Sequence, residues 1–213
     1  MTDELERFIR GGDRTELIHY VEHIEQIGMS GKMPRVVFRL VVFMIINTIY
    51  EIVYSVAGDE GIEVLHDIYY FEREDYFDVT LPEFEKVKKA CVKAKDIVAD
   101  KRKQSSNQIS GQVLQILESD YNNPQLSVQY VSDIIGVSPN YLSSIIKRET
   151  GSTFVELMTQ KIIENAQRML LHTDLKIRDI AEQCGYGDQY YFSHCFKKIT
   201  GESPGGYKKN NGI

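Results

Sequence analysis

Apolar residues in the first hundred positions recur every three or four residues, the spacing that amphipathic helices produce. The series at residues 5–9 and 17–27 are separated by Gly11 and Gly12, which predicts two helices with a loop between them. A further series along residues 84–98 predicts another helix. We therefore expect the N-terminal half of the chain to be a helical bundle.

The most apolar stretch of the chain, residues 36–54, has to be tested as a membrane span. Its uncharged centre, residues 40–50, is 11 residues long, lies between Arg39 and Glu51, and contains Asn47. A helix that crosses a bilayer needs about 20 apolar residues. The pattern favours a helix that is buried on most sides, either in a bundle or at a dimer interface.

One motif occurs twice, as LSVQYVSDIIGVSPNYLSSIIKRETG at residues 126–151 and as LKIRDIAEQCGYGDQYYFSHCFKKITG at residues 175–201. Two helices that cross steeply need a small residue where they touch and a turn residue that accepts positive φ. The matching small residues are Ser132 and Ala181, and the matching turn glycines are Gly136 and Gly185. A single copy fits a plain helical hairpin, but two copies with basic pairs at matching places favour two helix-turn-helix units, at about residues 126–149 and 175–199.

The segment between the two copies, residues 153–173, has apolar residues at helical spacing and predicts a helix of about 18 residues. The run KRKQSSNQ at residues 101–108 is polar, only weakly helical by composition, and is the expected hinge. The predicted fold is all-α. An N-terminal helical bundle, residues 1–104, precedes a two-subdomain double helix-turn-helix domain, residues 105–213, which is joined by a long helix.

The net charge of −6 argues at first against a nucleic-acid partner. The imbalance lies in residues 1–104, which hold 15 Lys and Arg against 20 Asp and Glu, whereas residues 105–213 hold 10 against 11. Basic residues of the C-terminal half come in pairs, at Lys147 and Arg148, Lys197 and Lys198, and Lys208 and Lys209. Clustered in this way, they can contact phosphates on a nearly neutral domain.

Other candidate chemistry is sparse. Cys91, Cys184 and Cys195 have neither metal-ligand nor disulfide spacing, so we expect packing residues in a reducing cytoplasm. His19 and His23 lie four residues apart and suit a metal site, but a third ligand is missing, which favours an exposed pair. With no glycine-rich phosphate loop or nucleophile elbow in the N-terminal half, we expect no enzymatic activity, no cofactor and no metal.

An aromatic and acidic segment occupies residues 59–78 of the N-terminal half. Its aromatic residues are Tyr69, Tyr70, Phe71, Tyr76 and Phe77. They are compatible with a ligand pocket, but aromatic residues on amphipathic helices more often form core, which is the interpretation we favour.

The second copy and its continuation, AEQCGYGDQYYFSHCFKKITGESPGGYK, resemble the double helix-turn-helix domain of the AraC/XylS family of bacterial transcription regulators. The resemblance rests on the GY turn, the YFS helix, the FKK exit and the G-x-S-P-x-x-Y ending, and it covers roughly residues 109–208. Residues 1–104 more distantly resemble the helical connector of AraC-output response regulators. No receiver with its phosphorylatable aspartate is visible, so we expect either a fragment of a longer regulator or a regulator that works without one.

The resemblance implies a cytoplasmic, sequence-specific DNA-binding regulator whose two recognition helices enter successive major grooves. It places base-reading residues at Asn140, Ser143, Ser144, Gln189, Tyr190, Ser193 and His194, and phosphate-binding residues at Lys147, Arg148, Lys197 and Lys198. The family often has arginine at the positions of Ser144 and His194, so this departure puts guanine readout in doubt at both helices. Lys161 also stands where the family favours arginine and is expected to keep a phosphate-binding or structural role.

The expected partners are double-stranded DNA, a second copy of the chain through residues 1–104, and RNA polymerase, with no membrane. The alternative is a helical sensor or protein-interaction module whose helix-turn-helix copies no longer bind DNA specifically. The overall charge and the missing arginines favour this alternative, whereas the geometry of both turns and the three basic pairs favour the regulator.

Overall fold

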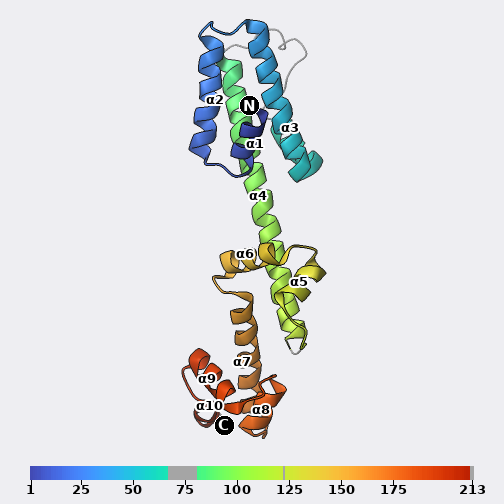
Figure 1. Cartoon of the computed structure of the whole chain (residues 1–213), viewed down its shortest axis with the longest axis vertical. Helices are drawn as coiled ribbons and strands as arrows, with labels where there is room; N and C mark the ends of the chain where they lie inside the picture. The colour runs from blue at the N-terminus through green and yellow to red at the C-terminus, as the bar shows by residue number, and fades with distance from the viewer. Residues whose placement is uncertain (67–80, 122, 212–213) are drawn as a thin grey trace. The chain divides into compact units, whose positions relative to one another are not determined.

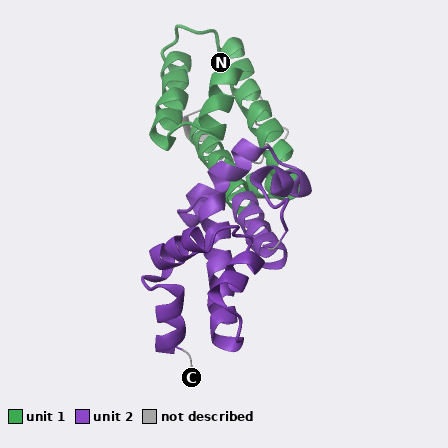
Figure 2. Cartoon of the chain, turned by 60° about the horizontal axis from the view of Figure 1, so that its bottom comes forward, with its two compact units in different colours: residues 1–104 green, residues 105–213 purple. Residues whose placement is uncertain are grey.

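The computed structural model of the chain describes residues 1–66, 81–121 and 123–211, and every regular element in these ranges is an α-helix (Figure 1). The all-α prediction is therefore confirmed. The chain forms two compact units, Met1–Gln104 and Ser105–Ile213 (Figure 2). The aromatic residues predicted as core, Tyr69, Tyr70, Phe71, Tyr76 and Phe77, lie outside the described residues.

Helices α1 (Thr2–Arg10) and α2 (Arg14–Met29) open the first unit, and the chain breaks between them at the two glycines, as predicted. The backbone N–H of Thr15 donates to the Asp13 carboxylate at 2.6 Å, and Glu16 completes a capping box. These hydrogen bonds to the charged form hold the pKa of Asp13 below its usual range. The start of α2 is thus fixed by its own cap.

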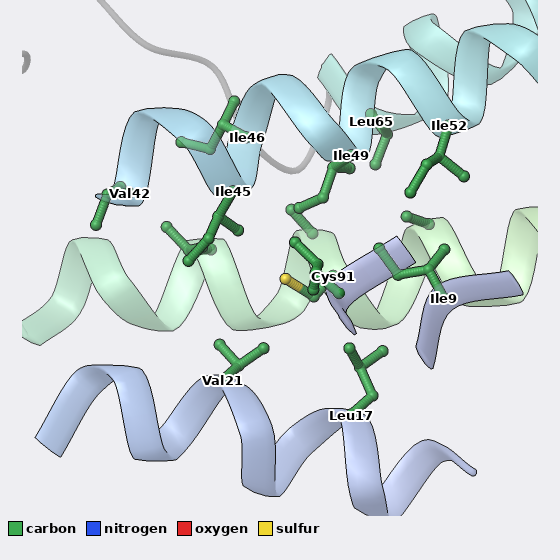
Figure 3. Packing of buried hydrophobic residues seen from close by; sticks show 14 of the residues in the cluster. Ile9, Leu17, Val21, Val42, Ile45, Ile46, Ile49, Ile52, Leu65 and Cys91 are labelled. Atoms are coloured by element: carbon green, nitrogen blue, oxygen red, sulfur yellow. The ribbon is translucent and has the colours of Figure 1, made fainter. Parts of the chain in front are cut away.

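The core of the first unit lies between α1, α2, α3 (Arg35–His66) and the first part of α4 (Leu81–Asp120). Val42, Ile45 and Ile49 of α3 point toward α4 (Figure 3). At one end of this core the rings of Phe38 and Phe84 stack with centroids 5.6 Å apart. One face of α3 therefore supplies much of the core of this unit.

The described residues leave the opposite face of α3 exposed. Large apolar side chains along it remain between two fifths and three fifths exposed: Val36 60%, Val37 42%, Leu40 57%, Phe43 50%, Met44 45% and Tyr54 60%. By length and composition alone α3 could cross a membrane, yet close to half of its most apolar 18-residue window is buried inside the unit. Within a single chain, the described helices of the unit pack along one side of α3 only. Burial of the other side at a dimer interface, the second alternative, stays a prediction.

Residues 101–108 are helical and lie inside α4, so the prediction of weak helicity at this place is wrong. Lys, Arg and Gln have high helix propensity, which outweighs the two serines and the asparagine of the run. Ser106 is fully buried, and Ile109 and Val113 continue the apolar stripe into the core of the second unit. Packing thus supports the helix across the polar run.

The second unit contains two helix-turn-helix pairs. These are α5 (Val128–Ile135) with α6 (Pro139–Thr150), and α8 (Ile177–Gln183) with α9 (Gln189–Thr200); α10 (Pro204–Asn211) follows. Between the pairs runs α7 (Phe154–His172), a helix of 19 residues. Phe154 of α7 is buried in the core of the first pair, and Ile163, Ala166 and Leu170 are buried in the core of the second pair. The predicted arrangement of two subdomains joined by a long helix is confirmed.

Both turns are built as the repeated motif predicts. Gly136 has φ 79° and Gly185 has φ 81°, a conformation that side chains with a Cβ rarely adopt. Ser132 and Ala181 are buried where the two helices of each pair meet. Ser138 then caps α6, accepting from the backbone N–H of Tyr141.

We expect Gly185→Ala to lower the free energy of unfolding of the second unit by about 1 to 2 kcal/mol, because alanine is strained at positive φ. A Cβ at Gly185 meets no atom within 4 Å, so the loss would come from backbone strain alone. Hydrogen exchange of peptides from α8 and α9, together with urea denaturation, measures the change.

The matched control is Gly187→Ala, two residues away, where a Cβ also has open space and φ is not positive. Its stability should stay the same or rise slightly. Equal losses in the two variants would contradict the strain argument.

Candidate nucleic-acid interface

Helix α9 separates a buried face from an exposed one. Asp188 caps it by accepting from the backbone N–H of Tyr190 at 2.7 Å. Phe192 and Phe196 are fully buried against the core, which turns the opposite side of the helix outward. Tyr190 is 85% exposed in the first turn of α9. A largely exposed aromatic side chain at the start of the helix is thus accessible to a partner.

The four predicted base-reading residues of α9 share one side of the helix but differ in their exposure to solvent. Gln189, Tyr190 and His194 are exposed, whereas Ser193 is half-buried. The hydroxyl of Ser193 donates to the carbonyl oxygen of Gln189 at 2.8 Å. Of the predicted base-reading residues of α9, these three are therefore the accessible ones.

Helix α6 repeats the arrangement with shorter side chains. Leu142, Ile145 and Ile146 are fully buried on its inner face. The predicted base-reading residues Asn140, Ser143 and Ser144 are all exposed on its outer face. Since serine reaches less far than glutamine, tyrosine or histidine, α6 offers a shallower polar surface than α9.

The basic pair at the end of α6 already has partners inside the unit. The amine of Lys147 donates to the carbonyl oxygen of Gly151 at 2.7 Å and lies 3.8 Å from the carboxylate of Glu156. The guanidinium of Arg148 donates to the hydroxyl of Ser106 in α4 and to the carboxylate of Glu149. A phosphate at this place would have to replace these partners.

The corresponding pair of α9, Lys197 and Lys198, is exposed in the last turn of the helix. The N–H and hydroxyl of Thr153 donate to the carboxylate of Glu156, which holds the pKa of Glu156 below its usual range, and the charges of Lys147 and Lys198 lower it further. The charged form of Glu156 is therefore stabilised by a basic residue from each helix-turn-helix copy.

Other basic residues of the unit serve structural contacts. Lys161 on α7 forms ion pairs with Glu118 of α4 and Glu164, which raise its pKa, and its side chain is only 18% exposed. Lys208 donates to the carbonyl oxygen of Thr173 at 3.0 Å. These ion pairs support the structural one of the two roles predicted for Lys161.

An aromatic cluster holds the inner face of α9 in place. Tyr186 from the turn packs edge-on against Phe192 at 5.3 Å, and Tyr207 of α10 packs edge-on against Phe196 at 5.5 Å. Burial raises the pKa of Tyr186 to about 12 and that of the neighbouring Cys184 to about 11. The turn and the C-terminal ending thus both act by positioning α9.

The contacts of Arg148 with Ser106 and of Lys161 with Glu118 were not predicted from the sequence. Each joins α4 to a residue more than 40 positions further along the chain, so spacing carries no signal for them. His19 and His23 are both exposed on α2, and no group of three potential metal ligands occurs in the part of the chain that the structure describes.

A family model described as a helix-turn-helix domain matches residues 131–210. The chain is 32% identical over 107 residues to the uncharacterized transcriptional regulatory protein YesN of Bacillus subtilis, covering 49% of this chain and 29% of that protein. It is 33% identical over 86 residues to the xylose operon regulatory protein of Escherichia coli K12, covering 40% of this chain and 22% of that protein. The chain thus spans less than a third of the length of these curated relatives.

Among solved structures, the C-terminal domain of AraT, a response regulator from Geobacillus stearothermophilus, is 39% identical. The match covers 49% of this chain and 87% of that chain, with a TM-score of 0.46.

Proposed function

Because the C-terminal unit of this chain belongs to the AraC/XylS family of helix-turn-helix transcription regulators, we propose that the chain binds specific sequences of double-stranded DNA and regulates transcription. The single observation that carries the proposal is the pair of capped helices, α6 and α9, each with a buried apolar face and an exposed polar one. In this proposal both are recognition helices.

The length of α7 suits two successive major grooves. A helix of 19 residues is about 28 Å long, close to the ~34 Å of one turn of DNA. Because α7 is buried in the cores of both pairs, it fixes the separation of α6 and α9 within the unit. One unit would then cover about two turns of DNA.

Base reading is assigned to the exposed faces of the two helices. Gln189 and Asn140 suit adenine, which can accept one hydrogen bond from a side-chain amide and donate another to it. Tyr190 and His194 extend the reading surface of α9, whereas Ser143 and Ser144 limit α6 to short contacts. The longer side chains of α9 support a larger share of specificity for the second copy.

Phosphate binding is assigned first to Lys197 and Lys198, whose amines are exposed. Lys147 and Arg148 would contribute less, because binding a phosphate there means giving up the contacts with Gly151, Ser106 and nearby carboxylates. This asymmetry between the copies is absent from the sequence pattern, in which the two basic pairs match.

The proposed cellular location and further partners follow from DNA as the partner. A DNA-binding regulator of this kind would work in the cytoplasm and contact RNA polymerase when bound at a promoter. Pairing of two chains through residues 1–104 would place two such units on one operator and raise the affinity for a two-site DNA.

Selection of binding sites from random DNA tests base reading. We expect His194→Ala and Tyr190→Ala to change preference at a few adjacent base pairs, by about 1 to 3 kcal/mol at each position. Ser144→Ala should change preference less, because serine makes fewer contacts. Gln112→Ala, at an exposed position of α4, is the control and should return the motif of the parent chain. If the selection enriched no sequence for the parent chain, the proposed function would be contradicted.

The salt dependence of DNA affinity tests the phosphate contacts. Each of Lys197→Gln and Lys198→Gln should weaken binding to all sequences alike and flatten the slope of log affinity against log salt by about one unit. Lys147→Gln should have a smaller effect, because its amine is already engaged.

The control for the loss of one positive charge is Lys32→Gln, at an exposed position of the first unit. It should leave the slope unchanged. An unaltered slope in the Lys197→Gln, Lys198→Gln double variant would remove these lysines from the interface.

A further inference from the structure

We propose that the face of α3 that the described residues leave exposed pairs with the same face of a second copy of this chain, as a parallel, in-register helix seam with Asn47 opposite Asn47. The inference deepens the pairing through residues 1–104 proposed above. It does not depend on DNA binding, so the two proposals can fail separately.

The exposed positions of α3 follow the repeat of a coiled-coil seam. Val36, Leu40, Phe43, Asn47 and Tyr54 are all exposed and are spaced by four, three, four and seven residues. These are a and d positions of a heptad, with residues 40, 47 and 54 at a and residues 36 and 43 at d, whereas the next d residue, Tyr50, is half-buried. The stripe spans about 18 residues, long enough for more than two heptads.

Val37 and Met44 lie beside the stripe, and both are exposed. The residues of the other face, among them Val42, Ile45 and Ile49, are buried in the unit (Figure 3). The seam and the core therefore use opposite sides of one helix.

The apolar area of the stripe fits a dimer. Six large apolar residues that are about half exposed leave roughly 600 Å² uncovered on each chain, or about 1,200 Å² for a pair. A specific interface needs at least about 1,000 Å² in total. An apolar patch of this size on one helix is at the upper end of what single soluble chains expose.

Asn47 distinguishes a second copy from a lipid surface. Its amide stands in the middle of the stripe and carries donors and an acceptor, and a second Asn47 across a two-fold axis supplies both complements. Lipid chains would leave these groups unsatisfied. A single asparagine at an a position also selects the register of a two-stranded coiled coil.

The charge of the first unit argues against one other occupant of this face, an anionic membrane. Residues 1–104 carry 20 acidic against 15 basic side chains, and Glu51 lies at the edge of the stripe. An excess of negative charge is repelled by anionic membrane surfaces. Two copies carry the same excess and repel each other as well, so the case for a second copy rests on the apolar stripe and on Asn47.

Sedimentation of the full chain without DNA tests the pairing. The parent should be a dimer at micromolar concentration, and the Leu40→Glu, Phe43→Glu double variant should weaken dimerisation by at least about 100-fold, because two charges on each chain would be buried in the seam. Leu114→Glu, at a similarly exposed apolar position of α4 in the second unit, is the matched control and should remain dimeric.

Circular dichroism of the double variant should show the helix content of the parent, because both substituted side chains already face solvent in the single chain. Its affinity for DNA with one site should also be unchanged. This result separates loss of pairing from loss of DNA binding.

Disulfide cross-linking tests orientation, because two cysteines must come within a Cα separation of about 4.4 to 6.8 Å. In a parallel seam Leu40→Cys cross-links with itself on oxidation, and so does Tyr54→Cys. In an antiparallel seam centred on Asn47, only a mixture of the two variants cross-links. Covalent dimers of each variant alone support the proposal.

Three results would overturn the proposal: a monomeric parent chain, a double variant that remains dimeric, or cross-links in the mixture alone. Flotation of the parent chain with neutral phosphatidylcholine vesicles, abolished by the double variant, would assign the stripe to a membrane and overturn it as well.

Discussion

The burial of α7 in two separate cores is the constraint on which the second unit depends. Phe154 anchors the start of the helix in one core, and Ile163, Ala166 and Leu170 anchor its later turns in the other. Because a helix rises 1.5 Å per residue and resists bending, the number of residues between these anchors sets the distance between the two helix-turn-helix pairs. A change of helix length would alter the spacing of both reading surfaces, even if every surface residue stayed the same.

The second constraint is electrostatic. The unit is nearly neutral, and several of its basic side chains are held by carboxylates or carbonyl oxygens of the same unit. Internal ion pairs and hydrogen bonds of this kind lower nonspecific attraction to DNA, and in the proposed complex only a few exposed lysines would be left to contact phosphates. Glu156, whose lowered pKa keeps it charged, acts on basic residues from both copies. Affinity would therefore depend on the exchange of internal partners for phosphates.

Much of the second unit could be predicted from the sequence, because its signals are local. Glycines that need positive φ, serine caps and small residues at helix crossings act within a few positions, and Gly136, Ser138 and Ala181 do what their spacing indicates. Which side chains face outward on α6 and α9 also follows from helical periodicity. The reading of these residues as base contacts stays a prediction.

What could not be predicted depends on contacts between distant parts of the chain. The partner of Arg148 is Ser106, 42 residues earlier, in a run that composition describes as a hinge. The exposure of Leu40 and Phe43 could not be predicted from the sequence for a different reason. An apolar helix looks the same in sequence whether its neighbours cover one side or all sides, so the uncovered face of α3 emerges only once the helices around it are placed.

In the proposed complex, α6 and α9 enter successive major grooves of one DNA duplex at the spacing that α7 sets. Hydroxyl-radical footprinting of the full chain on a single selected site measures this spacing directly. We predict two protected segments on one face of the duplex, with centres about 10 base pairs apart. One protected segment, unchanged when the outer faces of α6 are substituted, would contradict the claim and leave α9 as the only helix that reads DNA.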